Sequence, residues 1–562
     1  MVKFMRAYWN IFIFIGLLSA LGFNANAAEP PHAGDQIRQI PPSPPVRKTA
    51  PELPAKQEHT PTVPIPTHST IRVNSLHITG QTVYSETELI TITGFKPASE
   101  LTLNDLREMA LKISDFYHKN GYFVAFAYLA AQEITNGTVN ISVVEGHYGD
   151  ISVHNKTNLS DNLAHSLLSG LSTGGLIYSA PLERRLLLLS DLPGIVVKST
   201  MVPGGSIGAS DLIVDITSGE RVTGSVEADN AGNRYTGAYR LGVTVNLNNP
   251  MGLGDIATLR TLVSNGGLYY VRTSYQIQTG NVTVGAAYSV LGYQLGEEFK
   301  DLQANGTAQI MSIFGSYPLI RSYDKNLRVQ LAFDDKTFQD RVDSTSTVTD
   351  KSARVLMISL YGDQRDNFYG GGQNSYSLTW TTGSITLQTP SVYVSDAVTA
   401  QTSGQYNKFS YRAMRLQNIT EAISLYAAIN GQLALKNLDV SEKIELGGMY
   451  AVRAYPEGEA YADQGYIMNL EVRLLLPPFS ERMPGQIHLI GFADTGTVTI
   501  NKNPWTSEPN HKTLQGAGLG ITWEKYNDFA VKAYYARKLG SETATSAPDS
   551  PDQFWVQLVK YF

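Results

Sequence analysis

Residues 239–248 read Tyr-Arg-Leu-Gly-Val-Thr-Val-Asn-Leu-Asn, a stretch in which apolar residues alternate with polar or small ones. Successive side chains of a β-strand point to opposite faces, so this period of two predicts a strand with one apolar face and one polar face. Similar alternation recurs further along the chain, for example in residues 376–382 and 521–525. From about residue 220 onward we therefore expect a β-structure.

Alternation alone fits both a soluble β-sandwich and a membrane-spanning barrel. The end of the chain favours the barrel, because residues 553–562 place four apolar side chains on one face: Phe554, Val556, Leu558 and Phe562. Lys560 interrupts this face and can extend its ammonium group to water at the membrane boundary. The 31 tyrosines suit the aromatic girdles of such barrels. Since a closed barrel pairs its backbone groups, lipid tolerates it, and we predict a transmembrane β-barrel over residues 220–562.

The first residues carry an export signal. Lys3 and Arg6 precede an apolar core at residues 11–23, and residues 25–27 read Ala-Asn-Ala, the small-x-small pattern of a cleavage site. We predict a signal peptide over residues 1–27. The alternative, an uncleaved anchor helix, requires about 20 apolar residues, more than this core offers.

Composition excludes several classes of function. The 562 residues include no cysteine, which excludes disulfide frameworks, thiol catalysis and cysteine-ligated metals. The net charge is −6, and no basic cluster with interleaved aromatic residues is present, so nucleic acid is not expected as a partner. Only His488 and His511 lie beyond residue 170, and no pair has zinc-site spacing on one helix. We assign no metal site and no cofactor.

Two small α/β units are expected between the signal peptide and the barrel, at residues 71–146 and 147–219. Each reads strand, helix, helix, strand, strand, which indicates an internal repeat. In the first unit Ser85 and Thr102 cap the two helices, and Asn120-Gly121 ends the second. The expected elements are 71–79, 85–94, 102–120, 123–129 and 138–144 in the first unit, and 149–154, 160–169, 181–190, 195–201 and 212–217 in the second.

Residues 28–70 are rich in proline, which sustains neither helix nor sheet, so we expect an extended linker there. Only residues 34–40 can form a short helix before Pro41 stops it.

Two motifs resemble those of enzymes and are better explained by the fold. Residues 204–208 read Gly-Gly-Ser-Ile-Gly, as in the nucleophile elbow of serine hydrolases, but two strand-like runs flank them and no helix follows. A hairpin loop is the better interpretation. Gly516-x-Gly518-x-Gly520 has the third glycine misplaced for a dinucleotide fingerprint, and we expect a barrel strand with small inward residues. We find no convergent catalytic set and predict no enzymatic activity.

Several motifs together resemble one family, the outer-membrane transporters of two-partner secretion, which comprises the haemolysin-activator and filamentous-haemagglutinin-transporter group. These belong to a superfamily whose barrels carry periplasmic POTRA (polypeptide-transport-associated) domains. The motifs of the first α/β unit run from Asn120-Gly121-Tyr122 through Gln132 to Glu145-Gly146, and Leu182-Glu183-Arg184 marks the second. Asp229-Asn230 and residues 249–255 are similar to the start of the family's barrel.

The most specific motifs lie at Val452-Arg453-Ala454-Tyr455 and Phe492-x-Asp494-x-Gly496. They are similar to the family's Val-Arg-Gly-Tyr/Phe motif, on a loop folded back into the barrel, and to its partner motif on the barrel wall. The resemblance implies a loop–barrel latch in which Arg453 pairs with Asp494, with Asn469 to Arg473 on the strand between. Ala454 replaces the usual glycine, and alanine resists a positive φ. A lumenal pair in partial water adds little stability, so we expect it to fix one position of a movable loop.

The resemblance implies a fold of 16 antiparallel strands with two N-terminal periplasmic α/β POTRA domains, in the outer membrane of a Gram-negative cell. The inward-folded loop is expected around residues 450–465, and residues 36–40, within the short helix expected at 34–40, are a short candidate for the family's plug helix. The POTRA domains are expected to capture the substrate, through residues that match the family motifs: Asn120, Gly121, Tyr122, Gln132, Glu145, Gly146, Glu183 and Arg184.

The leading functional hypothesis is a transporter that exports one large partner protein with an N-terminal secretion domain. The partner is an adhesin, a haemolysin or a contact-dependent toxin, and the transporter is expected to be a monomer in outer-membrane lipid. The alternative is an assembly factor of the same superfamily that inserts proteins into the membrane. A passive porin, or a surface enzyme, would require no pair of POTRA domains.

Overall fold

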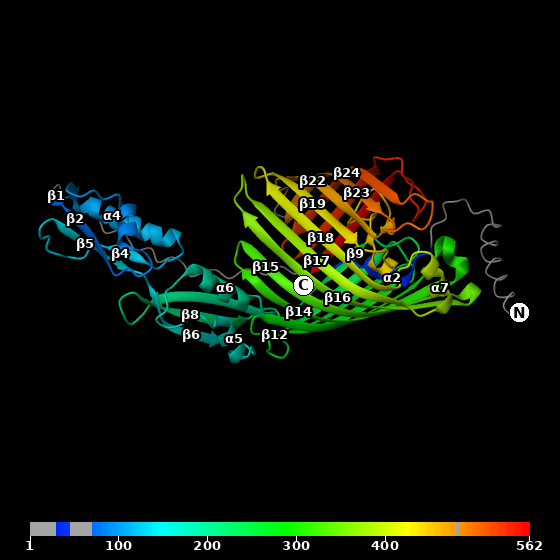
Figure 1. The fold of residues 1–562 in the computed structure, drawn as a ribbon, viewed down its shortest axis with the longest axis horizontal. Helices are drawn as coiled ribbons and strands as arrows, with labels where there is room; N and C mark the ends of the chain where they lie inside the picture. Colours follow the sequence, from blue (N-terminus) through cyan, green and yellow to red (C-terminus); the bar gives the residue numbers. More distant parts are fainter. Residues whose placement is uncertain (1–29, 45–69, 479, 481–482) are drawn as a thin grey trace, which may run out of the picture.

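A computed structural model describes residues 30–44, 70–478, 480 and 483–562. The expected signal peptide lies outside these residues, as does most of the proline-rich linker. Figure 1 shows two small α/β units in a row that lead to one end of a large barrel. Within the described ranges, no helix is both long and apolar enough to cross a membrane.

The first α/β unit has a three-stranded sheet of order β2-β5-β4, in which β2 is parallel to β5 and β4 is antiparallel to it. A separate antiparallel pair, β1 and β3, was not expected, because Asn74 interrupts the strand predicted at residues 71–79 and donates its backbone N–H to Gly137 at 2.7 Å. The elements are β1 Thr70–Val73, β2 Ser75–Thr79, α3 Glu86–Thr93, β3 Ser99–Thr102, α4 Leu103–Lys119, β4 Phe126–Tyr128 and β5 Thr138–Val144.

The second unit repeats this topology with sheet order β6-β8-β7, where β6 is parallel to β8 and β7 is antiparallel to it. Leucines of both helices, among them Leu167, Leu182 and Leu186, are fully buried beneath the sheet. Residues 204–208 form the loop between β7 and β8, so they are not a nucleophile elbow. The elements are β6 His147–Asn155, α5 Asp161–Leu168, α6 Ser179–Ser190, β7 Ile195–Pro203 and β8 Ala209–Ser218.

The barrel is closed and has 16 antiparallel strands, as predicted. The strands are β9 Val222–Asp229, β10 Arg240–Asn248, β11 Ile256–Ser264, β12 Tyr269–Thr279, β13 Val282–Gln294, β14 Ala304–Arg321, β15 Lys325–Val342, β16 Thr347–Asp366, β17 Gly372–Leu387, β18 Gly404–Asn418, β19 Ile423–Ala434, β22 Gln464–Leu475, β23 Gln486–Thr499, β24 His511–Lys525, β25 Phe529–Lys538 and β26 Asp552–Tyr561. The glycines of residues 516–520 lie on β24, as expected. Short helices lie in its connections: η1 Glu297–Leu302, η2 Asp343–Thr345 and α7 Pro390–Val398.

The barrel carries its apolar side chains outward, which distinguishes it from a soluble β-sandwich. On β10, Leu241 and Leu247 are 51% and 47% exposed, whereas Arg240 and Thr244 are 6% and 5% exposed. In water such a surface would be costly, and in lipid it is the favourable arrangement. The polar face of the alternating sequence therefore lines the lumen.

The seam between β26 and β9 closes the barrel with only five paired residues, from Gln557–Asp229 to Tyr561–Ser225. Asn230 extends this short pairing with its side chain. Its Nδ2 donates to the carbonyl of Phe554 at 2.7 Å, and its Oδ1 accepts from the N–H of Val556 at 2.7 Å. These side-chain bonds add to the backbone bond from the N–H of Asn230 to the carbonyl of Val556, at 3.2 Å.

Candidate functional site: the inward-folded loop

Residues 435–463, between β19 and β22, fold back into the lumen as one long loop. The loop contains η3 Val440–Glu442 and a short antiparallel pair, β20 Ile444–Glu445 with β21 Tyr461–Ala462. Its tip is buried: Val452, Ala454 and Tyr455 have no exposed surface. The loop thus begins earlier in the sequence than the expected residues 450–465.

At the tip, Arg453 binds two carboxylates of the barrel wall. Its Nε and Nη2 donate to the two oxygens of Asp494 at 2.8 and 2.7 Å, and its Nη1 donates to Glu471 Oε1 at 2.8 Å. The backbone N–H of Arg453 also donates to Asp494, at 3.1 Å. Paired, parallel bonds of this kind fix the plane of the guanidinium as well as its position.

Aromatic side chains enclose the Arg453 guanidinium. It lies 3.6 Å from the ring centre of Phe492 and 5.0 Å from that of Tyr534, both close enough for cation–π attraction. The indole N–H of Trp555 donates to the carbonyl of Arg453 at 2.7 Å. The loop tip is therefore held through side chain and backbone from β23, β25 and β26.

The remaining motif residues shape the contact between loop and wall. Ala454 does not have a positive φ, so the strain expected from alanine at this position is absent. Its methyl group instead faces Gly516 on β24, where an added Cβ would come within 2.3 Å of it. At Gly496, an added Cβ would lie 2.3 Å from Leu446 of the loop. Two wall glycines therefore give the loop its close approach, and the glycine of the loop motif is not needed here.

The expectation of a pair in partial water is wrong. The side chains of Arg453, Glu471 and Asp494 are 5%, 5% and 0% exposed. A charge buried without its partner is strongly unfavourable, so removal of either sign should cost about 3–5 kcal/mol. The latch thus contributes more to the loop's position than a solvated ion pair can.

The base of the loop carries ion pairs of the opposite sense, with carboxylates on the loop and lysines on the wall. Asp439 lies 2.9 Å from Lys351, and Glu442 lies 2.8 Å from both Lys336 and Lys408. Further along, Glu459 pairs with Lys512 of β24 and accepts backbone N–H groups of Thr545 and Ser546.

The helix considered at residues 34–40 is α2, Ala33–Arg38, and it lies in the lumen beside this loop. The N–H of Ala33 donates to Asp340 of β15 at 2.7 Å, and Arg240 of β10 donates to the carbonyl of Gln39 at 3.1 Å. Arg38 donates to the carbonyl of Ser441 in the loop at 3.3 Å. The helix thus contacts both the wall and the base of the loop.

In the first α/β unit, Glu145 is 2% exposed and is bonded within the fold, so it is not accessible to a substrate, contrary to its expected role in capture. It accepts hydrogen bonds from the backbone of Thr82 and Val83 and from the hydroxyl of Tyr117, at 2.7, 2.8 and 2.8 Å. Burial raises the pKa of Glu145, but these hydrogen bonds outweigh it and hold the pKa below its ordinary value.

Other predicted capture residues also have structural contacts. Asn120 bonds the carbonyl of Phe116 at the end of α4, and Gln132 bonds both backbone groups of Asn140, so that it continues the pairing of β5 beyond β4. Gly146 adopts a φ of 78°, a conformation that favours glycine, where the chain passes into β6.

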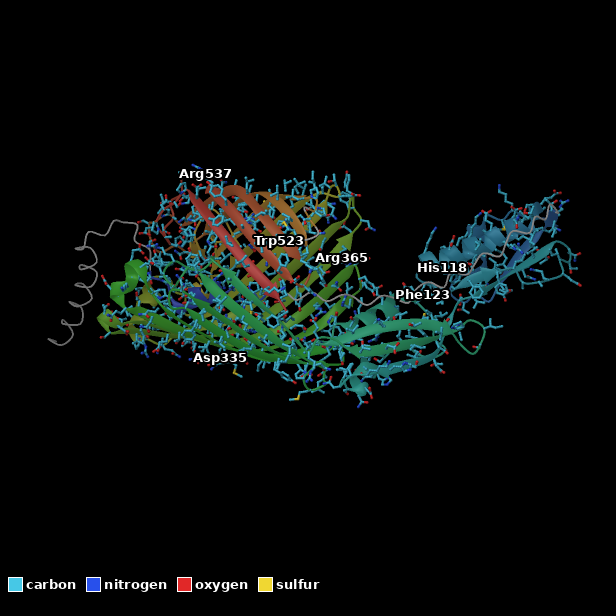
Figure 2. The ribbon with its side chains drawn as sticks, turned by 180° about the vertical axis from the view of Figure 1, so that it is seen from behind. His118, Phe123, Asp335, Arg365, Trp523 and Arg537 are labelled. Atoms are coloured by element: carbon cyan, nitrogen blue, oxygen red, sulfur yellow. The ribbon has the colours of Figure 1, made fainter. Side chains whose placement is uncertain are left out.

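Gly121 and Tyr122 lie where the two α/β units meet. Gly121 accepts the N–H of Ser179 at 2.9 Å, and the ring of Tyr122 lies 5.1 Å from that of Tyr178. Phe123, labelled between the units in Figure 2, packs against the core of the second unit. These residues fix one unit to the other.

Glu183 and Arg184 contact the barrel and are therefore not presented to a substrate on an exposed surface. Arg184 donates to the carbonyls of Pro318 and Leu319 at 2.8 and 3.2 Å, and Glu183 accepts the N–H of Tyr323. On the same side, Asp191 pairs with Arg321 at 2.7 Å. This attachment marks the β14–β15 turn as the end of the barrel that carries the α/β units.

Sequence reasoning placed Glu471 in the motif on the intervening strand without giving it a role, and it missed Tyr534 and Trp555 as members of the site. Glu471 had a signal, because alternation places it on the polar face of its strand with Asn469 and Arg473. Asn469 donates to Asp494 at 2.8 Å and to the carbonyl of Ala451 at 2.9 Å. Tyr534 and Trp555 come from strands far along the chain, and no local pattern distinguishes them from other barrel aromatics.

A closed 16-stranded barrel with a POTRA pair and a lumenal loop defines a class, the POTRA-bearing outer-membrane transporters. The family model for the haemolysin secretion/activation protein ShlB/FhaC/HecB matches residues 208–523, and that for the ShlB-type POTRA domain matches residues 71–146. The chain belongs to this family of two-partner secretion transporters. It resides in the outer membrane with its POTRA domains in the periplasm.

Named relatives agree with this membership. The chain is 30% identical to the heme/hemopexin transporter protein HuxB of Haemophilus influenzae (strain 86-028NP), over 82% of each chain. It is 22% identical to the outer membrane transporter CdiB of Dickeya dadantii, over 75% of this chain and 74% of that one. The structure of CdiB from Escherichia coli matches with a TM-score of 0.68 at 18% identity, over 92% of this chain and 94% of that one. BamA from Haemophilus ducreyi matches with a TM-score of 0.54 at 13% identity, over 88% and 100%.

Proposed function

We propose that this transporter captures the N-terminal secretion domain of a large partner protein in the periplasm and passes it in extended form through the barrel lumen. The observation that carries the proposal is the loop bound inside a closed barrel by Arg453, Asp494 and Glu471. A loop held by discrete, geometrically specific contacts has a second arrangement when those contacts are released, and that is the requirement for a gate.

Capture is assigned to the free sheet edges of the POTRA units, not to the motif residues. Among the described residues, strand β7 pairs with β8 on one side only, so its nine residues present a backbone edge to a partner strand. Backbone pairing of this kind is the mode of β-augmentation, which reads an extended segment without a fixed sequence. The motif residues then hold the edges in place relative to the barrel mouth.

Export through the lumen is favoured over membrane insertion by the relatives, since HuxB and CdiB are both named as transporters. The proposed state is a monomer whose outward apolar face contacts outer-membrane lipid. The proposed activity is transport without catalysis, and among the described residues no group of three His, Asp or Glu is arranged to hold a metal ion.

The partner is proposed to act in the uptake of heme or hemopexin, because HuxB is the relative that is 30% identical over most of both chains. Retention of the secreted partner on hemopexin–agarose, with an albumin resin as the control, tests this assignment. A partner recovered equally from both resins contradicts it.

Removal of residues 71–219 tests the transport proposal. The shortened barrel is expected to insert and to shift in mobility on heating, as the full chain does, while the partner accumulates in the periplasm. Secretion at the level of the full chain would contradict the capture role.

A further inference from the structure

An apolar groove crosses the outward face of the barrel at the seam between β26 and β9. Its volume is about 370 Å³, within the roughly 300–1,000 Å³ of ligand-binding pockets. Residues of β24, β25, β26 and β9 line this seam groove, and all of them except Lys560 are apolar. The strand register places four of its residues in one row across these strands: Trp523, Val531, Leu558 and Ala228. The groove therefore spans the five-residue pairing that closes the barrel.

The seam groove lies near the periplasmic end of the barrel. The second POTRA unit binds the β14–β15 turn, so this end faces the periplasm. Because consecutive strands are antiparallel, every second connection lies at the same end, and the β24–β25 turn is one of these. Figure 2 shows Trp523 nearer to the POTRA units than Arg537, which lies toward the other end of β25. The groove thus faces the inner leaflet of the outer membrane, which is composed of glycerophospholipids.

Two aromatic rings form one side of the groove. Trp523 and Phe529 meet edge to face, with their ring centres 4.8 Å apart. The indole N–H of Trp523 donates to the carbonyl of Pro484, in the β22–β23 connection, at 2.9 Å. A tryptophan with an apolar ring surface and a bonded polar edge is typical of the membrane interface. The periplasmic end of the groove therefore lies at the level of the lipid headgroups.

Two lysines lie at this level. Lys525, Phe529 and Lys560 occupy the next row toward the periplasm, across β24, β25 and β26. Both ammonium groups bind the same carboxylate, Asp528, which Lys525 contacts at 2.9 Å. An ammonium group has three N–H donors, and among the described residues Asp528 is the hydrogen-bond acceptor of each lysine. Two cations opposite one carboxylate leave a net positive charge, and donors remain for a further anion.

We infer that the seam groove binds one acyl chain of an anionic glycerophospholipid, whose phosphate is bound by Lys525 and Lys560. The acyl chain fills a hollow whose lining would otherwise lose its van der Waals contacts. Lysine binds phosphate as a point charge, and basic sites at a membrane surface select anionic headgroups. A phosphatidylglycerol is thus preferred over a zwitterionic phosphatidylcholine. The inference uses the location and orientation of the barrel and does not depend on the proposed route of export.

The test uses lipids with brominated acyl chains, which quench tryptophan fluorescence on contact. Two tryptophans lie on outward strand faces, Trp523 at the groove and Trp380 on β17, away from it. The purified transporter is reconstituted in phosphatidylcholine vesicles with increasing fractions of brominated phosphatidylglycerol or brominated phosphatidylcholine. In the Trp380→Phe variant, which keeps Trp523, half-maximal quenching should require an at least threefold smaller fraction of the brominated phosphatidylglycerol. In the Trp523→Phe variant, which keeps Trp380, the two lipids should quench alike.

The lysines are tested in the Trp380→Phe background. Lys525→Gln with Lys560→Gln should abolish the threefold preference, and Lys525→Arg with Lys560→Arg should retain it. The matched control is Arg537→Gln, which removes an exposed cation at the other end of the same strands and should leave the preference unchanged. Heat-modifiable mobility checks that each variant is folded.

Three results would overturn the inference. The first is equal quenching of Trp523 by the two lipids, and the second is an equal preference at Trp380, which would reflect general attraction of anionic lipid to the barrel. The third is a preference that survives the loss of both lysines. Excess inorganic phosphate should leave the preference in place, and its loss there would assign the lysines to free phosphate and not to a lipid.

Discussion

The two anchors of the inward loop use opposite charges and different chemistry. At the tip, the loop supplies the cation, Arg453, and the wall supplies the carboxylates Asp494 and Glu471. At the base, the loop supplies the carboxylates, Asp439 and Glu442, and the wall supplies lysines. The same wall therefore binds one segment through both signs of charge.

The difference between the anchors lies in how much geometry each specifies. A guanidinium bound along two edges and stacked on Phe492 has one orientation, whereas a lysine ammonium is a compact charge that tolerates several. Glu442 is shared by Lys336 and Lys408, and Lys408 also donates to the carbonyl of Glu442 at 2.7 Å, so loss of one contact leaves others. The tip therefore holds the loop in one orientation, whereas the base holds it through contacts that allow several geometries; we call the base contacts the tether.

The largest effect is expected from Arg453→Ala, which leaves two wall carboxylates buried without a cation. The lost anchoring of about 3–5 kcal/mol should free the tip, and secretion of the partner should fall at least tenfold while the barrel still inserts. Immunoblots of the culture medium measure secretion, and mobility on heating measures insertion. Arg354→Ala, which removes an exposed arginine, is the control.

The reversed pair Arg453→Asp with Asp494→Arg sharpens this result, since it restores opposite charges in contact. Some secretion should return relative to either single change. If the double variant secretes no better than the worse single variant, direct pairing is not what the arginine contributes.

Exchange of the two cation types tests the comparison between the anchors directly. Arg453→Lys keeps the charge and loses the parallel bonds to Asp494, so secretion should fall about tenfold, whereas Lys336→Arg at the base should change it less than twofold. Similar losses in both variants would show that the anchors do not differ in specificity. Purified-chain melting temperatures confirm that neither change unfolds the barrel.

Glu442→Gln tests the tether itself and should have a smaller effect, about threefold on secretion, because the backbone bonds from Lys408 and Gln432 remain. Hydrogen exchange of residues 440–445 should become faster, while exchange of residues 450–455 stays slow. Faster exchange at the tip as well would mean that the two anchors open together.

Glu145 of the first POTRA unit shows what a buried carboxylate contributes outside the lumen, and its effect on export should be the smallest. Its folded-state pKa is depressed, so its stabilising contribution is present above the unfolded pKa of about 4.3 and is lost as pH falls through the folded value. In the native chain, the protection of residues 82–90 against hydrogen exchange, measured relative to the intrinsic exchange rate at each pH, should fall on acidification.

Glu145→Gln should accelerate the same exchange at pH 7, by an amount equivalent to about 2 kcal/mol, and should reduce the dependence on pH. Glu133→Gln, a change in the same unit away from this network, is the control. An unchanged pH dependence in the Glu145 variant would assign the effect to another group.

The sequence by itself determined the strand pattern and the class of fold. Alternation in residues 239–248 requires one apolar and one polar face wherever the strand lies, and the motifs around Arg453 and Asp494 carried the resemblance to the family. The helix caps at Ser85 and Thr102 were predictable for the same reason, because capping depends on residues only three positions apart.

Only the tertiary structure decided how the charged groups are paired and buried. Glu145, Glu183 and Arg184 looked available for substrate, yet burial and docking depend on residues up to about 140 positions away, which local patterns do not encode. Likewise the sequence did not show how Ala454 is accommodated. Its φ is not positive, and its methyl group lies against Gly516, on a strand far along the chain. Local rules fix the faces of a strand, whereas closure of the barrel decides which faces meet.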